Sequence, residues 1–404
     1  MSAKSAVLFC MRGQGHFQRL RPLIAGLARC DIVTYVFTEA TFRAEVERLG
    51  GRFVDLYAGR PPEEADATTT PRPCREVSFA GHYGDDVVRE VAALRPAIVL
   101  HDSFAVIAVV VANHLELPRV NVCAGHNRPP GAALEALRGN PRVNISEDCW
   151  RAVRLLRERH GMPDASPFSF ADTLSTDLNV YCEPPQFLHV EERAPFQPIA
   201  FMGSLLPDEP SGADASSGFG LESDERVRIY ASFGTRIWRL WADQALNVLE
   251  ALSEFVAQTS DTVALISLGG FTSPQRAARL VRANVQVEPY VDQWSVLGKA
   301  SVFLTHHGLN STHEAIFHQT PMISYPFFVD QPALAARCQA LGLAIPLVET
   351  LRGAVGPQDI GAALARVAAE RTAIGARLAE ARRWELETIA ARPAVIARII
   401  DLMR

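Results

Sequence analysis

Short runs of consecutive hydrophobic residues alternate along this chain with stretches in which hydrophobic residues recur at helical spacing. Buried strands of a parallel sheet are continuously apolar, whereas amphipathic helices repeat every three to four residues. The apolar runs lie at 6–11, 32–38, 96–102, 119–123, 176–181 and 198–202, and then at 227–232, 263–268, 285–288, 300–304 and 322–326. This pattern predicts an α/β protein with two similar, doubly wound domains.

A break in composition separates the two halves. Residues 206–226 are rich in Pro, Gly and Ser, which is typical of a linker between domains. We therefore expect a first domain at 1–205, a linker at 206–226, a second domain at 227–385 and a terminal segment at 386–404. Within these bounds, a charged helix is expected from Pro357 to about Trp384 and a last helix over 389–404.

The stretch 305–331, THHGLNSTHEAIFHQTPMISYPFFVDQ, carries the most chemistry. It follows an apolar run and predicts a strand, a tight turn and a helix, with Ser311 as N-cap and Glu314 at the capping-box position. Free N–H groups and the dipole at a helix start favour phosphate. His306 and Asn310 would add side-chain donors to such a site. An ordinary βαβ unit with a capped helix is the alternative interpretation.

This stretch resembles the donor-binding signature of the family 1 nucleotide-sugar glycosyltransferases, written T-H-x-G-x-N-S-x-x-E-A, then G-x-P, then P-x-x-x-D-Q. The residues in register are Thr305, His306, Gly308, Asn310, Ser311, Glu314, Ala315, Pro321, Pro326, Asp330 and Gln331. His307 and Gln319 depart, because they stand where the family usually has Gly. We expect His307 to narrow the donor pocket and Gln319 to alter the end of the helix. The resemblance implies the GT-B architecture, two Rossmann-like doubly wound domains facing across a cleft, with the last helix packed on the first domain.

Two residues of the first half match the catalytic pair of the same family. The turn after the first strand holds a G-x-G, but the third glycine of a dinucleotide fingerprint is replaced by Gln18, which argues against a dehydrogenase. The turn instead resembles the family's first loop, with His16 on the general base and Asp102 on its carboxylate partner. A carboxylate on one ring nitrogen fixes the tautomer, and the other nitrogen can take a proton. Alternatively, Asp102 caps the following helix.

Further segments resemble the donor site. Residues 232–235 are similar to the S-x-G-[ST] turn that contacts the diphosphate, and 290–293 to the W-x-P-Q segment, with Tyr290 placed to stack on the base. The donor-binding residues implied are Ser232, Gly234, Thr235, Tyr290, Val291, Gln293, His306, Gly308, Asn310, Ser311, Glu314, Asp330 and Gln331. For the acceptor we single out His82 and His126, with exposed surface positions as the alternative. No spacing of metal ligands is visible in the sequence.

Composition narrows the functional class. The 404 residues are 48% hydrophobic and 21% charged, and the net charge of −5 argues against a nucleic-acid-binding surface. Seven scattered Cys without a C-x-x-C pair predict buried free thiols in a reducing cytosol. Met1–Ser5 is too short for a signal peptide, and no apolar run reaches the length of a membrane span. We expect a cytoplasmic protein.

The resemblance implies an inverting hexosyltransferase that moves a sugar from a UDP- or dTDP-sugar to a hydroxyl of a small-molecule acceptor, without metal or cofactor. By analogy with bacterial members, the acceptor would be a natural product such as an antibiotic precursor. Two alternatives stay open, a sugar-nucleotide epimerase of the same architecture and a non-catalytic homologue that binds nucleotide sugar. The sequence does not name the sugar, the nucleotide or the acceptor, and it is compatible with a homodimer.

Overall fold

The computed structural model describes residues 4–123, 130–207 and 226–403. The chain divides into two compact units, one made of Met1–Leu206 with Glu387–Arg404 and the other of Pro207–Leu386. Most of the expected linker, 208–225, and the acceptor candidate His126 lie outside the described residues. No helix in the described ranges has both the length and the apolar character needed to cross a membrane.

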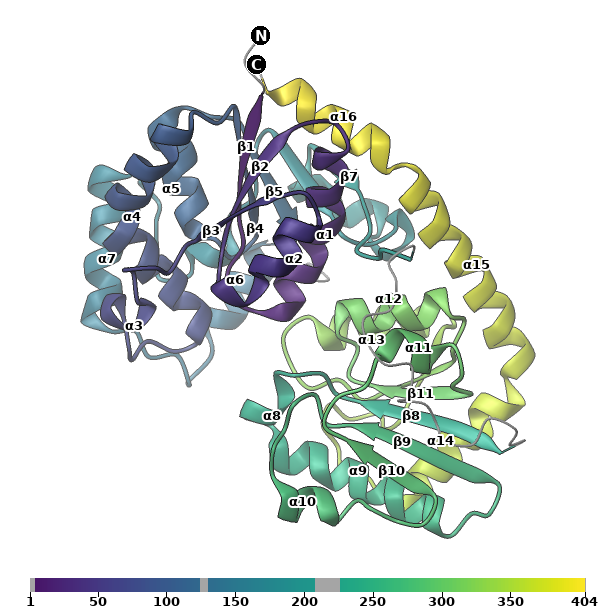
Figure 1. The fold of residues 1–404 in the computed structure, drawn as a ribbon. Helices are drawn as coiled ribbons and strands as arrows, with labels where there is room; N and C mark the ends of the chain where they lie inside the picture. The colour runs from purple at the N-terminus through teal and green to yellow at the C-terminus, as the bar shows by residue number, and fades with distance from the viewer. Residues whose placement is uncertain (1–3, 124–129, 208–225, 404) are drawn as a thin grey trace. The chain divides into compact units, whose positions relative to one another are not determined.

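Unit 1 is built on one parallel sheet of seven strands (Figure 1). The strands are β1 (Ser5–Phe9), β2 (Val33–Thr38), β3 (Arg52–Asp55), β4 (Ile98–Asp102), β5 (Arg119–Cys123), β6 (Leu178–Tyr181) and β7 (Ile199–Phe201). Their order is β3-β2-β1-β4-β5-β6-β7. β1 pairs with β2 on one side and β4 on the other, so that Val7 lies opposite both Tyr35 and Val99. The strand order reverses between β1 and β4, and open α/β sheets bind ligands at the carboxyl edge of such a point.

Helices cover both faces of this sheet because successive β1 side chains point to opposite faces. Ala6 and Leu8 belong to one hydrophobic cluster, and Val7 and Phe9 to another. The helices of unit 1 are α1 (Gln14–Ala28), α2 (Arg43–Arg48), α3 (Pro62–Ala65), α4 (Arg75–Leu94), α5 (Val106–Leu115), α6 (Pro130–Arg138), α7 (Glu147–Arg159) and α16 (Arg392–Leu402). Short 3-10 turns lie at Ala40–Phe42, Arg72–Cys74, Ser169–Ala171, Pro185–Phe187, Val190–Glu192 and Ala194–Phe196.

The last helix, α16, packs within unit 1 although it ends the chain. A Cβ on Gly26 of α1 would lie 2.7 Å from Ile396 Cδ1, so the small residue lets the two helices approach closely. The buried Arg392 donates to the carbonyl oxygens of Met202 at 2.8 Å and Leu205 at 2.6 Å. These bonds satisfy backbone groups at the end of the first sheet that would otherwise be buried without a partner.

Unit 2 is a second parallel sheet, with six strands in the order β10-β9-β8-β11-β12-β13. The strands are β8 (Val227–Ser232), β9 (Thr262–Ser267), β10 (Val285–Glu288), β11 (Val302–Thr305), β12 (Met322–Ser324) and β13 (Ala344–Pro346). The helices are α8 (Ile237–Leu240), α9 (Ala242–Ala257), α10 (Pro274–Ala278), α11 (Gln293–Leu297), α12 (Leu309–Phe317), α13 (Gln331–Ala340), α14 (Pro357–Ala369) and most of α15 (Arg371–Ala390), whose last residues belong to unit 1. The strand order reverses between β8 and β11. In this sheet too, the carboxyl ends of the two central strands are therefore the place where open α/β sheets bind ligands.

The structure corrects the expected elements at three places. The strands β3 and β13 have only four and three residues, and these short strands were not predicted. The single helix expected from Pro357 to Trp384 is two helices that break at Glu370. The last helix begins at Arg392 and not at 389, because 389 and 390 still belong to α15.

Candidate active site

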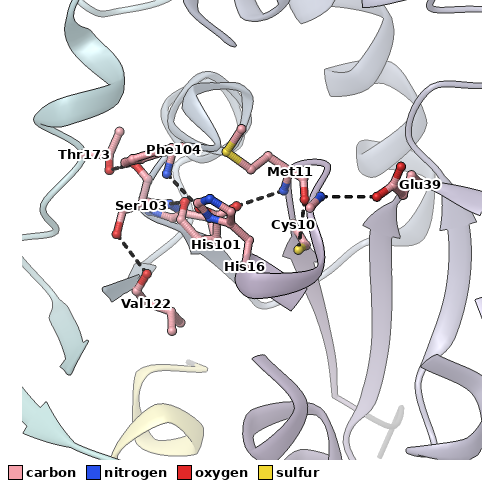
Figure 2. A network of polar contacts seen from close by, with 11 residues as sticks. Cys10, Met11, His16, Glu39, His101, Ser103, Phe104, Val122 and Thr173 are labelled. Carbon is pink, nitrogen blue, oxygen red and sulfur yellow. Dashed lines mark hydrogen bonds and ion pairs between the residues drawn. The ribbon is translucent and has the colours of Figure 1, made fainter. Parts of the chain in front are cut away.

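In unit 1, His16 and Asp102 meet at the switch point of the sheet. His16 lies in the first turn of α1, which follows β1, and Asp102 is the last residue of β4, the neighbouring strand. His16 Nδ1 is 3.1 Å from Asp102 Oδ1 (Figure 2). The His16 side chain keeps 13% of its surface exposed and that of Asp102 only 1%. The pair therefore joins an imidazole that solvent or a ligand can reach to a buried carboxylate.

Three groups hold the Asp102 carboxylate in place. Oδ1 accepts from the backbone N–H of Phe104 at 2.9 Å as well as facing His16, and Oδ2 accepts from the N–H of Met11 at 2.8 Å (Figure 2). Burial alone would raise the pKa of Asp102, but the His16 charge and these hydrogen bonds outweigh it and hold the pKa below its usual value. Asp102 is therefore held as an anion beside His16. The alternative prediction that it caps α5 is wrong, because the N-cap is Ala105 and no side chain among the described residues caps that helix; Asp102 only fixes the turn before it through the Phe104 N–H.

A second histidine, fully buried and not predicted from the sequence as a site residue, supports this strand end. His101 Nδ1 lies 2.9 Å from the Asp102 carbonyl oxygen, and Arg119 Nη1 lies 3.0 Å from His101 Nε2. Burial, and then the charge of Arg119, lowers the pKa of His101 to about 3, so this imidazole is neutral. The neutral ring can donate from Nδ1 and accept at Nε2, which matches the two contacts. Arg119 also donates to the carbonyls of Thr173 and Leu174.

The acceptor candidates do not join the pair among the described residues. His82 is exposed on α4, and its ring contacts the neighbouring Tyr83 ring edge-on at 4.5 Å. His126 lies outside the described residues. The ring beside His16 is instead that of Phe104, with centroids 5.1 Å apart, and Phe104 in turn meets Phe170 at 5.3 Å. These aromatic contacts depend on the tertiary fold, and the sequence carried no signal for them.

In unit 2, α12 begins one turn earlier than the sequence predicted. Gly308 is its N-cap, with no side-chain cap, and the Gly308 carbonyl accepts from the Thr312 N–H at 3.0 Å and Thr312 Oγ1 at 3.1 Å. Ser311 is thus inside the first turn, and the expected capping box with Glu314 is wrong. Because no side chain caps the helix, its first N–H groups stay available to an anion.

His306 sits under this helix start in a space that two glycines create. A Cβ on Gly308 would lie 2.5 Å from His306 Nε2, and one on Gly234 would lie 2.9 Å from it. Within the described residues, the buried Nδ1 of His306 and Oδ1 of Asn310 have no hydrogen-bond partner. Burial lowers the pKa of His306 to about 4, with the Ser232 backbone opposing the shift. Two unpaired polar atoms in one buried turn indicate a site completed by a ligand.

His307 is hydrogen-bonded to other parts of the turn's surroundings, and the expectation that it narrows the donor pocket stays a prediction. Its side chain is fully buried, with Nδ1 3.2 Å from Thr312 Oγ1 on α12 and Nε2 2.7 Å from Ser324 Oγ on β12. Its backbone N–H also donates to Thr305 Oγ1 at 3.2 Å. Burial, and then His306, lowers the pKa of His307 to about 3. The neutral ring joins the turn to the adjacent helix and strand.

The side-chain amide of Gln293 joins three of the residues predicted to bind the sugar donor. Gln293 Nε2 donates to Ser311 Oγ at 3.1 Å and to Glu314 Oε2 at 2.6 Å, and Gln293 Oε1 accepts from Tyr230 OH at 3.2 Å. Asp292 caps α11 through Ser295 N–H, which takes the place of the rigid Pro expected there. The segment after β10 is thus tied to the first turns of α12.

The ends of β8, β9 and β10 also come together. A Cβ on Gly269 would lie 2.3 Å from the Gly234 carbonyl oxygen, and one on Gly270 would lie 2.5 Å from the Tyr290 hydroxyl. Tyr290 is 63% exposed, and the Gly270 N–H donates to the Pro289 carbonyl at 2.9 Å. Around this edge, Ser232 is buried, Thr235 exposed and Val291 half-buried. The exposed Tyr290 ring is therefore positioned by backbone packing and keeps much of its surface free.

Asp330 and Gln331 lie at the start of α13, after β12. Gln331 is buried, and its Oε1 accepts from the N–H groups of Phe327 at 3.0 Å and Phe328 at 3.3 Å. Asp330 is half-buried at the N-cap. Val329, just before them, has φ of +60°, which is strained for a β-branched residue. Gln331 thus shapes the loop with its amide oxygen, and its amide nitrogen is the group left to meet a ligand.

Comparison with known proteins shows which family this chain is similar to. A family model described as "UDP-glucoronosyl and UDP-glucosyl transferase" matches residues 185–372, which include most of unit 2. Among curated proteins, the zeaxanthin glucosyltransferase of Pseudescherichia vulneris is 25% identical over 252 residues. That alignment covers 58% of each chain, so the match spans about three fifths of the relative's length. The resemblance predicted from the sequence is confirmed.

Solved structures share the fold over almost the whole chain. The glycotransferase of kitacinnamycin superposes with a TM-score of 0.74 at 19% identity, covering 98% of this chain and 100% of that one. The spinosyn rhamnosyltransferase SpnG, complexed with thymidine diphosphate, gives a TM-score of 0.65 at 17% identity, covering 98% and 100%. The predicted α/β fold with two parallel sheets, as in these glycosyltransferases, is thereby confirmed.

Proposed function

We propose that this relative of the UDP-glucuronosyl and UDP-glucosyl transferases is itself a glycosyltransferase, which moves a sugar from a nucleoside diphosphate to a hydroxyl of a small-molecule acceptor. The observation that carries the proposal is the contact of His16 with the anionic Asp102 at the switch point of unit 1. A non-catalytic homologue would not require a base at this position, and an epimerase would form no product from an acceptor hydroxyl.

His16 acts as the general base. With its Nδ1–H directed to Asp102, the Nε2 lone pair can take the proton from the acceptor hydroxyl. The acceptor oxygen then forms a bond to the anomeric carbon as the bond from that carbon to the diphosphate oxygen breaks. Attack from the face opposite the diphosphate inverts the configuration. Asp102 stabilises the imidazolium that forms, because it stays charged in its buried position.

Unit 2 binds the donor and stabilises the departing diphosphate. The uncapped start of α12 and the orphaned Nδ1 of His306, when it carries the proton of the neutral ring, supply donors to its oxygens, and the side-chain amide nitrogen of Asn310 adds another. Ser232, Gly234 and Thr235 border the same edge, and the exposed Tyr290 ring can stack on the base. Asp330 and Gln331 would bind sugar hydroxyls. We therefore assign the stabilisation of the negative charge on the diphosphate to neutral hydrogen-bond donors and to the start of α12.

The donor nucleotide is UDP or dTDP and the acceptor a natural product. The family model and the zeaxanthin relative are described by UDP and glucosyl donors, whereas SpnG is described in complex with thymidine diphosphate. The kitacinnamycin and spinosyn enzymes are named for natural products. We place the reaction in a bacterial cytoplasm, with no metal or other cofactor.

A thermal-shift panel tests the proposal directly. The full-length protein is heated with UDP, dTDP, GDP, ADP and NAD in turn, since a ligand that binds only the native state raises the melting temperature with concentration. Stabilisation by UDP or dTDP selects the nucleotide, and UDP-glucose or dTDP-glucose is then incubated with flavonoid, macrolide and aromatic polyketide acceptors. A mass increase of one hexose supports transfer. Stabilisation by NAD alone would overturn the proposal.

A further inference from the structure

Three side chains that are far apart in the sequence converge where α4, α5 and the end of α7 lie together in unit 1. They are Asp85 in the middle of α4, His114 in the last turn of α5 and His160 directly after α7. One ligand atom of each lies within 4.8 Å of those of the other two. His114 Nε2 is 2.9 Å from His160 Nδ1. Two imidazoles and a carboxylate that are directed to a common point match the ligand set of zinc and related ions.

The cluster is built into the packing of three helices and is not a chance meeting of flexible side chains. His160 is 2% exposed, and a Cβ on Gly84 of α4 would lie 3.0 Å from its ring, so the glycine makes room for the imidazole. Asn113 Nδ2 donates to the backbone carbonyls of His160 at 3.2 Å and Gly161 at 3.1 Å. These contacts fix the buried His160 imidazole. The exposed side chains of His114 and Asp85 can change conformation to match it.

We propose that Asp85, His114 and His160 form a binding site for a divalent transition-metal ion, Zn²⁺ above all. Metal–nitrogen distances of about 2.0–2.1 Å at a tetrahedral centre separate two imidazole nitrogens by roughly 3.3 Å. The nitrogens of His114 and His160 are 2.9 Å apart, so His114 needs to move by only a few tenths of an ångström. Water completes the coordination, and the ion links α4, α5 and the end of α7.

The site is separate from the catalytic pair. Asp102 precedes α5, whereas His114 lies in its last turn, about 12 Å further along the helix axis at 1.5 Å per residue. The ion would therefore stiffen unit 1 and take no part in sugar transfer. One neighbour opposes binding, since Arg159 Nη2 lies 2.9 Å from Asp85 Oδ2 and competes for the carboxylate. Removing the Arg159 charge should therefore raise the affinity of the site for the metal ion.

The test uses the full-length, untagged chain with Cys30 replaced by Ser, because Cys30 is an exposed thiol. Co²⁺ is titrated and followed by its visible absorption, and Zn²⁺ is titrated by calorimetry. We expect one ion per chain and a higher melting temperature. His114→Ala and Asp85→Asn should each weaken binding at least about tenfold, since even outer-shell changes cost that much. Arg159→Gln should tighten it about two- to fivefold, the strength of a surface ion pair.

His82→Ala is the matched control, because it removes an exposed histidine from the same helix, and it should leave the affinity unchanged. Absence of binding by the untagged chain would overturn the proposal, as would an affinity that survives His114→Ala. Weaker binding by Arg159→Gln would contradict the role of Asp85. If the His160→Ala variant does not fold, the variants of the two exposed residues, His114→Ala and Asp85→Asn, still test whether the metal ion binds here.

Discussion

His307 and Gln319 share one backbone feature, a φ of +57°, in the left-handed region that favours glycine. They flank α12, and they are the two positions of the donor-binding signature at which this chain has another residue where the family usually has Gly. Their side chains have opposite surroundings, since His307 is buried between Thr312 and Ser324 and Gln319 is exposed. The same backbone strain is therefore offset by side-chain contacts at one position only.

Gln319→Gly should stabilise unit 2. Glycine adopts a positive φ without the steric cost of a Cβ, and we expect a gain of about 0.5–1 kcal/mol after its larger loss of chain entropy. The measurement is the urea midpoint of the unfolding transition, compared at constant slope. A lower midpoint would show that the Gln319 side chain contributes more than its exposure indicates.

His307→Gly should have the opposite effect, although it relieves the same strain. The change deletes two side-chain hydrogen bonds and leaves a cavity, and the buried hydroxyls of Thr312 and Ser324 lose a partner. We expect a loss of about 1–3 kcal/mol in the free energy of unfolding. Gln319→Gly is its control in the same denaturation series. An unchanged or raised stability would contradict a structural role for the imidazole.

Acid should destabilise the protein through its buried histidines. The pKa values of His101 and His307 are lowered to about 3 and that of His306 to about 4, all below the unfolded value of about 6.5. The unfolded chain then binds more protons than the native state, so stability is complete above pH 6.5 and falls as the pH drops toward 3.

The variant that isolates one of these groups is His307→Asn, because Asn tolerates a positive φ and does not titrate. Its free energy of unfolding should fall less steeply between pH 6.5 and 4 than that of the unmodified protein. His82→Asn removes an exposed histidine and should leave the slope unaltered. Equal slopes for His307→Asn and the unmodified chain would mean that His307 does not contribute to the acid sensitivity.

Asn310→Ala should weaken nucleotide binding more than it affects stability. Its buried Oδ1 has no partner in the described part of the protein, so removing it costs no internal bond there. Loss of a hydrogen bond from its amide to a charged diphosphate should raise the dissociation constant of UDP or dTDP by about ten- to hundredfold, or 1.5–3 kcal/mol. Calorimetry checks this, with Asn284→Ala as the control, because Asn284 directly precedes β10 and so lies at the amino edge of the sheet. Equal affinities for Asn310→Ala and the unmodified protein would remove Asn310 from the donor site.

The sequence predicted most strands and the contact between His16 and Asp102, because the strands are local apolar runs and the two residues match a family motif. Asp102 ends an apolar run, and His16 follows another, so parallel pairing of β1 with β4 was enough to bring them together. The orientation of His307 could not be predicted, because it depends on Ser324 of a neighbouring strand. Likewise, the cluster of Asp85, His114 and His160 exists only once three helices pack.

The central claim is that His16 removes a proton from the acceptor. The most direct test compares the turnover of the unmodified enzyme with that of His16→Ala, using the nucleotide sugar and acceptor found in the panel. We expect kcat to fall about 10²–10⁴-fold, while the dissociation constant of the nucleotide and the melting temperature stay the same. Unchanged turnover by a folded His16→Ala enzyme would contradict the proposed mechanism.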